Sequence, residues 1–167
     1  MMNTGGALKV TRPSDREIAM AREFAAPCEL VWEAYTRPEL LKQWLGVHNG
    51  WQLAVCQIDL RPGGAYRYVW RGPDTMKMGM GGVFKEIQPN RRIVATEQFD
   101  QAWYPGGQAI QTLTLLERGG LTTLTLNVRY ATTEARDVAL KSPMDQGVGI
   151  GFDTLERVLD EIKEAQS

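Results

Sequence analysis

The hydrophobic pattern is most regular near the C-terminal end of the chain. Apolar residues recur there at spacings of four and three: Val148, Phe152, Leu155, Leu159 and Ile162. Such a stripe is typical of an amphipathic helix. Ser142 is suited to cap that helix and Pro143 to occupy its first position. The pattern therefore predicts one helix over residues 142–166, which at the usual rise would span roughly 35 Å.

Three glycines alternate through the first turns of this predicted helix, at Gly147, Gly149 and Gly151. Each glycine costs about 0.8–1 kcal/mol relative to Ala in a helix interior. We favour the simpler interpretation, a frayed or late start with firm helix only from about Phe152. The alternative is that the glycines allow a close backbone approach, or leave room for a ligand beneath these turns. A phosphate-binding loop is disfavoured because no strand runs directly into the glycines and no Lys-Ser/Thr pair follows them.

Between residues 51 and 130 the pattern changes to short alternating runs separated by Gly, Pro and Asn. These runs predict six strands, at residues 51–60, 65–71, 76–87, 92–99, 108–117 and 121–130. The last run alternates most cleanly, with Leu124, Leu126 and Val128 on one face and Thr125 and Asn127 on the other. Consecutive strands joined by short turns form an antiparallel meander.

The N-terminal part adds one strand and two short helices. Residues 16–24 alternate and predict the strand, after which Pro27 and Pro38 each open a short helix. A further short helical stretch is expected near residues 133–140. The resulting order indicates an α+β fold in which a curved antiparallel sheet wraps around the long C-terminal helix.

The domain organisation follows from the same pattern. Residues 1–15 carry Gly and Pro with few apolar side chains, which predicts a flexible N-terminal tail. Residues 16–165 then form a single domain, since no linker, repeat or low-complexity tract interrupts them.

Composition excludes several classes of protein. The formal net charge of the 167 residues is −1 and no basic block is present, which argues against nucleic acid as a partner. No run of about 20 apolar residues exists, so no membrane span is expected. Cys28 and Cys56 fit neither a metal motif nor a disulfide framework, which favours reduced thiols in a soluble, cytoplasmic protein. His48 is the only histidine, so a metal site with two imidazoles is excluded, and we expect neither a metal nor a cofactor.

Three segments carry a family resemblance: residues 22–44 (REFAAPCELVWEAYTRPELLKQW), 59–68 (DLRPGGAYRY) and 81–99 (GGVFKEIQPNRRIVATEQF). They resemble the START-like, or SRPBCC, superfamily, and within it the family named after the activator of the Hsp-ninety ATPase. The resemblance extends over about residues 16–162 and implies the helix-grip fold. The superfamily includes lipid-transfer domains, hormone-binding proteins, aromatic polyketide cyclases and the chaperone-activating domain, so it implies no single activity.

The space between such a helix and its sheet is either packed core or a ligand cavity. The residues expected to face that space are aromatic or sulfur-containing: Trp44, Tyr66, Tyr68, Trp70, Met76, Met78, Met80, Trp103, Tyr104 and Phe152. Alternate methionines beside alternate aromatics would form an adaptable apolar wall. Each residue alone is as typical of a core as of a binding site, but the set and the fold together favour a cavity.

A catalytic role would require a titratable group in that cavity. Asp59, Glu86 and Glu97 lie on or beside predicted strands, and Arg22 and Arg61 could pair with them. A buried carboxylate with a raised pKa could serve as a general base, although an ion pair or a solvent-facing side chain is the simpler interpretation of each. No catalytic motif supports turnover, so no catalytic residue is assigned. Glu97 is retained as a ligand-binding candidate.

We therefore expect a protein that binds a small hydrophobic or aromatic molecule. One alternative is a cyclase- or hydratase-type enzyme, which an inward carboxylate bonded to Tyr or Arg near a pocket mouth would favour. Another is a protein-interaction module, which a filled core and a large exposed apolar patch would favour. Exposed edge strands also make a homodimer possible.

Overall fold

The computed structural model describes residues 6–166. Within them one sheet of eight strands has the order β1-β2-β8-β7-β6-β5-β4-β3, with every neighbouring pair antiparallel. The strands are β1 (Lys9–Thr11), β2 (Glu17–Phe24), β3 (Gln52–Ile58), β4 (Ala65–Arg71), β5 (Lys77–Gln88), β6 (Arg92–Phe99), β7 (Ala109–Arg118) and β8 (Leu121–Arg129). The helices are α1 (Cys28–Thr36), α2 (Pro38–Trp44), the 3-10 turn η1 (Pro73–Thr75), α3 (Thr133–Lys141) and α4 (Met144–Gln166).

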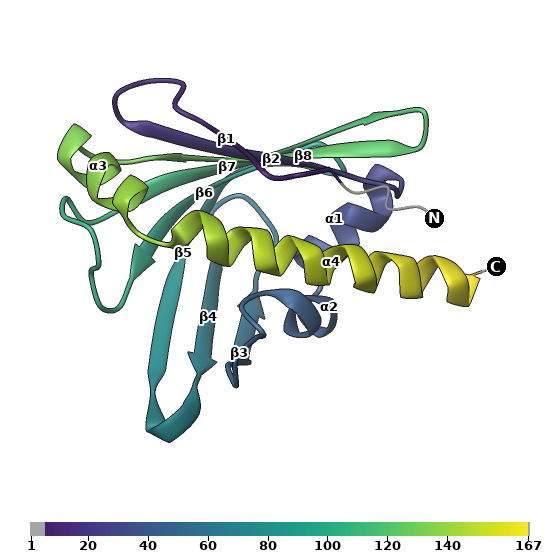
Figure 1. Ribbon diagram of the computed structural model, residues 1–167, viewed down its shortest axis with the longest axis horizontal. Coiled ribbons are helices and arrows are strands. Elements are labelled where there is room, and N and C mark those ends of the chain that lie inside the picture. Colours follow the sequence, from purple (N-terminus) through teal and green to yellow (C-terminus); the bar gives the residue numbers. More distant parts are fainter. Residues whose placement is uncertain (1–5, 167) are drawn as a thin grey trace.

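The sheet curves around α4, which confirms the helix-grip arrangement (Figure 1). In Figure 1 α4 crosses the molecule with β1, β2 and β8 on one side of it and β3 and β4 on the other. Helices α1 and α2 carry the chain from β2 to β3, the far edge of the sheet, and both contact α4. The chain therefore encloses the inner face of the sheet with helices.

Alternating side chains explain which face of the sheet is covered. On β2, Ile18, Met20 and Phe24 are each at most 1% exposed. Their partner strand β8 buries Leu124 and Val128 in the same way. Apolar alternation of this kind fixes the register, because a slip of one residue would turn the buried set toward solvent. The strands predicted from alternation agree with the structure to within two residues.

One strand lies in the segment predicted to be a flexible tail. Residues Lys9–Thr11 form β1, whose Val10 is paired with Met20 of β2. Three residues, of which only Val10 is apolar and that side chain is 41% exposed, carry too little alternation to be recognised in a sequence. The rest of the predicted tail includes residues 1–5, which lie outside the described part of the chain.

The first turns of α4 correct the interpretation that we favoured from the sequence. The helix begins at Met144 and continues through Gly147, Gly149 and Gly151, instead of becoming firm only near Phe152. Ser142 Oγ accepts a hydrogen bond from the Met144 N–H at 3.2 Å, which satisfies one of the free donors at the helix start. Packing of the apolar stripe against the sheet offsets the helix-forming cost of the glycines.

The tight turn between β3 and β4 is the turn predicted from its composition. The Arg61 Nε lies 3.0 Å from an Asp59 carboxylate oxygen. A Cβ added to Gly64 would lie 2.1 Å from the Asp59 carbonyl oxygen, so this position accepts only glycine. Within residues 6–166, no helix is both long enough and apolar enough to cross a membrane.

Candidate functional site

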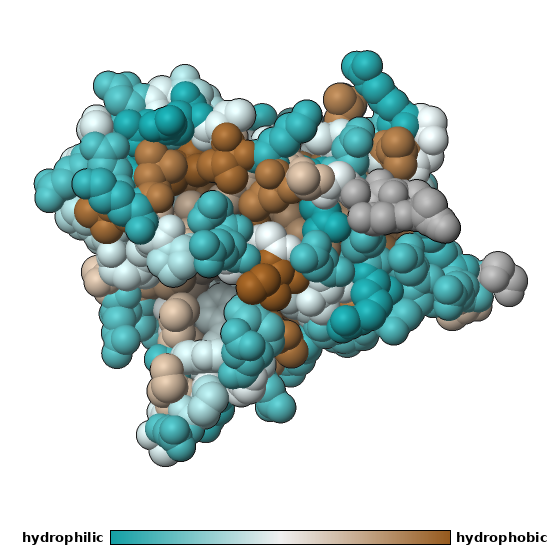
Figure 2. Space-filling view, viewed as in Figure 1, coloured by the Kyte–Doolittle hydropathy of each residue, from teal (hydrophilic) through white to brown (hydrophobic). Residues whose placement is uncertain are grey.

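A cavity of about 780 Å³ lies between the inner face of the sheet and the first half of α4. Small-molecule sites commonly enclose about 300–1,000 Å³. Leu60 and Met78 line the cavity yet are 38% and 42% exposed, so they mark its mouth. Figure 2 shows the surface hollowed below the first turns of α4. The core between helix and sheet is therefore incompletely filled.

The two halves of α4 differ in what their inner faces carry. The first half lines the cavity with Met144, Gly147, Val148, Gly151 and Phe152. The second half buries large side chains in the core: Leu155, Val158 and Leu159. A Cβ added to Gly147 would meet no atom within 4 Å. Gly147 is exposed and borders this open space at the edge of the cavity, whereas a Cβ added to Gly151 would contact Trp44 at 3.8 Å. Two of the three glycines therefore lie at the cavity, which agrees with the alternative that we had considered less favoured.

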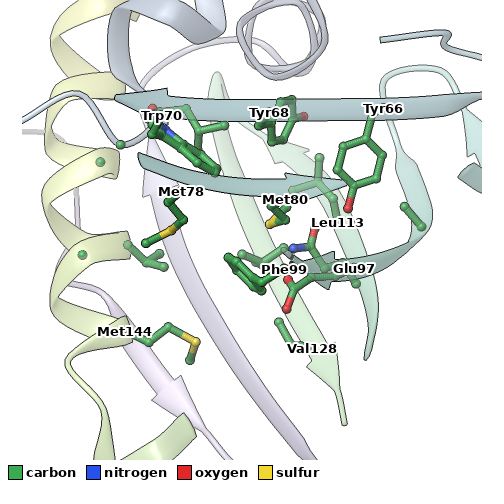
Figure 3. A pocket seen from close by; sticks show the side chains of 18 of the residues that line it. Tyr66, Tyr68, Trp70, Met78, Met80, Glu97, Phe99, Leu113, Val128 and Met144 are labelled. Carbon is green, nitrogen blue, oxygen red and sulfur yellow. Dashed lines mark hydrogen bonds between the residues drawn. The ribbon is translucent and has the colours of Figure 1, made fainter. Parts of the chain in front are cut away.

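The wall opposite α4 comes from alternate positions of β4 and β5. Tyr68 is paired with Met80 and Trp70 with Met78, so that aromatic rings and thioethers lie side by side (Figure 3). Neighbouring rings along β4 are in edge or tilted contact, with centroids 5.1 Å apart for Tyr66 and Tyr68. The structure brings nine of the eleven residues predicted to face this space to the cavity: Trp44, Tyr66, Tyr68, Trp70, Met78, Met80, Glu97, Trp103 and Phe152.

Met76 is one of two exceptions, and its predicted inward position is wrong. Its side chain is 51% exposed and does not line the cavity. The residue precedes β5 and closes the η1 turn, where its N–H donates to the Pro73 carbonyl and its carbonyl accepts from the Gly72 N–H. The methionine alternation therefore begins at Met78. Tyr104, also expected to face the cavity, is buried behind its wall.

Three polar groups of the wall are already hydrogen-bonded within the protein. The Tyr66 hydroxyl donates to the Thr96 carbonyl at 2.6 Å. The indole N–H of Trp44 donates to the Ala34 carbonyl and that of Trp70 to the Leu45 carbonyl, both at 2.9 Å. These bonds hold the rings in place and leave their apolar surfaces toward the cavity, as a hydrophobic ligand requires.

Glu97 is the carboxylate that faces the cavity. Its residue is 5% exposed and projects from β6 among Phe99, Leu113 and Val128 (Figure 3). The Tyr104 hydroxyl donates to Glu97 Oε2 at 2.8 Å, and the Gln111 side-chain amide donates to Oε1. Register explains the second contact, because Glu97 is paired with Ala109 of β7, two residues from Gln111.

Burial determines the protonation of this group. Desolvation raises the pKa of Glu97 above its ordinary value of 4.5, and the hydrogen bonds from Gln111 and Tyr104 lower it by less. Within residues 6–166 no ion pair neutralises the Glu97 carboxylate. The site therefore holds a carboxyl group that ionises reluctantly beside a large apolar space.

The other charged candidates lie outside the cavity. Asp59 is paired with Arg61 in the turn between β3 and β4, and Glu86 of β5 with Arg92 of β6 at 3.0 Å, and the side chains of both pairs are exposed. Arg22 is buried but reaches α4 instead of a strand carboxylate. Its Nη1 lies 2.6 Å from Asp153 Oδ1 and its Nη2 lies 3.4 Å from Glu156 Oε1. These contacts hold the helix against β2 and give it no part in the cavity.

Many lining residues were not among the predicted site residues, and those that could add chemistry or packing to the site include Met20, Tyr35, His48 and Gln111. Gln111 lies between buried Ala109 and Leu113 at alternate positions, which is the one sequence signal for an inward polar side chain. His48 Nδ1 is buried and has no hydrogen-bond partner among the described residues. The loop that holds His48 has no periodicity, so its approach to the cavity follows only from the tertiary fold.

The raised pKa of Glu97 predicts how stability depends on pH. Because the folded state holds this proton more tightly, the contribution of Glu97 is complete below about pH 4.5, the ordinary pKa, and is lost as the pH rises through the folded-state pKa. Glu97→Gln has no such titration, so it should not lose this stability at high pH. We therefore expect the free energy of unfolding of the variant, measured with urea from about pH 4 to about pH 8, to increase relative to that of the wild type as pH rises. Parallel curves for the two proteins would show that Glu97 is not perturbed.

Known proteins share this architecture. A family model described as Activator of Hsp90 ATPase homolog 1-like protein matches residues 25–160. A crystal structure from Rhodobacter sphaeroides is 33% identical, with a TM-score of 0.88, covering 93% of this chain and 99% of that one. A crystal structure from Nitrosomonas europaea is 28% identical, with a TM-score of 0.79 and coverage of 92% and 99%.

A crystal structure from Mycobacterium smegmatis shares the fold at 23% identity, with a TM-score of 0.80 and coverage of 92% of this chain and 98% of that one. No curated protein matches the sequence. The similarities therefore describe the fold and the family, and the chemistry must be argued from the cavity itself.

Proposed function

This chain belongs to the family described as Activator of Hsp90 ATPase homolog 1-like protein, and from that premise we propose that it binds a small hydrophobic or aromatic molecule. Membership supports a ligand-binding or interaction module in general. The observation that carries the narrower proposal is the apolar cavity of about 780 Å³ under the first half of α4. A protein selected only to fold would gain stability by filling that space, because empty apolar volume costs free energy.

The lining suits a flat apolar ligand. Rings of Tyr68, Trp70 and Phe99 present faces and edges on one side of the cavity, while Met80 supplies a polarizable surface that can adapt its shape (Figure 3). Because Tyr66, Trp44 and Trp70 already make hydrogen bonds within the protein, an apolar ligand leaves none of these three polar groups without a partner. The ligand would enter between the first turns of α4 and the exposed Met78.

Tryptophan fluorescence tests the proposal directly, because four of the five tryptophans line the cavity: Trp44, Trp51, Trp70 and Trp103. We expect the neutral probe N-phenyl-1-naphthylamine to quench this fluorescence in a saturable, one-to-one titration. An apolar ligand of this size that is largely buried should bind in the micromolar range, about −8 kcal/mol. A linear, non-saturating response would contradict the proposal.

A second candidate is an enzyme that moves a proton, and the Glu97–Tyr104 hydrogen bond favours it. A carboxyl with a raised pKa at a cavity wall can act as a general base. On a bound methyl ketone, Glu97 would take a proton from the methyl carbon while the C–H electron pair forms the enolate. A deuteron from the solvent-exchanged carboxyl would then return to carbon.

This second candidate predicts deuterium exchange into a ketone that fits the cavity. We would incubate 2-acetylnaphthalene with the protein in heavy water and follow the methyl protons by NMR. Exchange catalysed by the wild type but not by Glu97→Gln would support an enzyme. Equal background exchange in both, with binding retained, would leave a binding protein.

The interaction-module reading receives less support. The space between helix and sheet is not filled, and exposed apolar residues lie on several separate elements: Val10 on β1, Val83 on β5, Leu116 on β7 and Ile150 on α4. A homodimer remains a prediction from the exposed sheet edges. Both cysteines, Cys28 and Cys56, are free thiols, which supports the proposal of a reducing, cytoplasmic location.

A further inference from the structure

We infer that the ligand carries a protonated amine on an apolar skeleton, and that Glu97 binds this amine. The inference rests on the proposed function, because it assigns the polar group of a molecule that occupies the same cavity. It follows from the charges that line the cavity and from the hydrogen-bonding capacity that Glu97 leaves unused.

Among residues 6–166, the cavity lining contains one carboxyl group and no fixed cation. Glu97 is the only acidic residue that these residues contribute, and they contribute neither Lys nor Arg. The nearby Arg22 is committed to Asp153 and Glu156 of α4. A ligand anion would therefore find no cation to attract it and would be repelled by Glu97 when that group is ionised, whereas a ligand cation would be attracted to Glu97 and would favour its ionised form.

Glu97 retains acceptor capacity toward the cavity. A carboxylate can accept at about four lone-pair sites, and the described residues supply two donors, the Tyr104 hydroxyl and the Gln111 amide. Both donors are neutral, so neither compensates the charge. An ammonium group would add charge-assisted hydrogen bonds at the vacant sites, which are roughly twice as strong as bonds between neutral groups.

The surroundings of Glu97 suit a cation more than an anion. The other titratable groups that face it are the phenols of Tyr66, Tyr104 and Tyr130, and desolvation raises the pKa of each, so they remain neutral. Aromatic rings such as Phe99 beside the carboxyl can also attract an ammonium through their faces (Figure 3). Apart from Glu97 and the tyrosines, His48 is the one titratable side chain that residues 6–166 contribute to the lining.

Three probes with one naphthalene ring and different head groups test the inference. They are 1-naphthylmethylamine, which is cationic at neutral pH, 1-naphthylmethanol, which is neutral, and 1-naphthoic acid, which is anionic. Their dissociation constants would be measured by displacement of N-phenyl-1-naphthylamine from the wild type. We expect the amine to bind about tenfold more tightly than the alcohol, and the acid to bind most weakly.

Two variants test whether the preference for the amine depends on Glu97. Glu97→Gln should abolish the preference for the amine and leave the affinity for the alcohol within about threefold. Glu86→Gln, which removes a carboxylate of β5 paired with Arg92 outside the cavity, should retain the preference. The wild-type ranking of the three probes remains decisive even if Glu97→Gln does not fold.

The outcomes separate this inference from the proposed function. Equal binding of the three probes, or a preference for the acid, would overturn the amine assignment while leaving a hydrophobic binding protein. A preference for the amine that survives in Glu97→Gln would also overturn it. Failure of all three probes and of the reporter to bind would overturn the proposed function, and this inference with it.

Discussion

Replacing Gly147 of α4 with phenylalanine should prevent ligand binding without weakening the fold. Gly147 lies at the exposed edge of the cavity, and an added Cβ would have no atom within 4 Å, so a ring at this position can cover the mouth and take volume from the ligand while displacing no protein atom. Phe also forms helix more readily than Gly by a few tenths of a kcal/mol. We expect the dissociation constant of N-phenyl-1-naphthylamine to rise at least about tenfold and the unfolding free energy to stay level or rise.

Gly149→Phe is the matched control, because the same change is made two residues along the same helix. A Cβ added to Gly149 would face Leu8, 3.8 Å away, and Gly149 does not line the cavity. Its variant should bind the probe as the wild type does. If Gly147→Phe and Gly149→Phe weakened the probe equally, the effect would come from α4 as a whole, and the role of Gly147 in shaping the cavity would be wrong.

Trp44→Ala should cause the largest loss of stability among single changes at the cavity wall. Trp44 is 1% exposed at the end of α2, and its ring contacts Tyr35 and Phe152 with centroids 5.1 and 6.2 Å away. Truncating a buried Trp costs about 3–5 kcal/mol, and the Ala34 carbonyl also loses its hydrogen-bond donor. Urea denaturation should show a loss of that size, out of a total stability of about 5–15 kcal/mol.

Trp51→Ala serves as the comparison for Trp44→Ala. Trp51 lines the same cavity but is only partly buried, so its truncation should cost less than about 2 kcal/mol. Equal losses for the two variants would mean that Trp44 does not anchor the contact between α2 and α4.

The sequence alone predicted the elements and their order because each rests on local periodicity. The structure buries the residues of both patterns: the alternating Leu124, Leu126 and Val128, and Phe152 and Leu155 of the helical stripe. The edge strand β1 was missed because three residues carry too little pattern.

The shape of the site was harder to predict, because core and cavity use the same residues at the same spacing. The glycines of α4 show the difficulty. Local propensity favoured a frayed start, whereas tertiary packing keeps the helix intact and turns Gly147 into part of the cavity. The partners of Glu97 depend on the register of β6 against β7 and on a loop that returns Tyr104 to the sheet, neither of which a local pattern can specify.

The most direct measurement is an NMR titration of the methionine methyl groups with N-phenyl-1-naphthylamine. Met20, Met78, Met80 and Met144 line the cavity, while exposed Met76 lies outside it and serves as an internal control. Binding in the cavity predicts saturable shifts of the first four methyl signals and none at Met76. Shifts confined to Met76 and Met78, the two exposed methionines of this group, or no shift at saturating probe, would contradict a ligand cavity between α4 and the sheet.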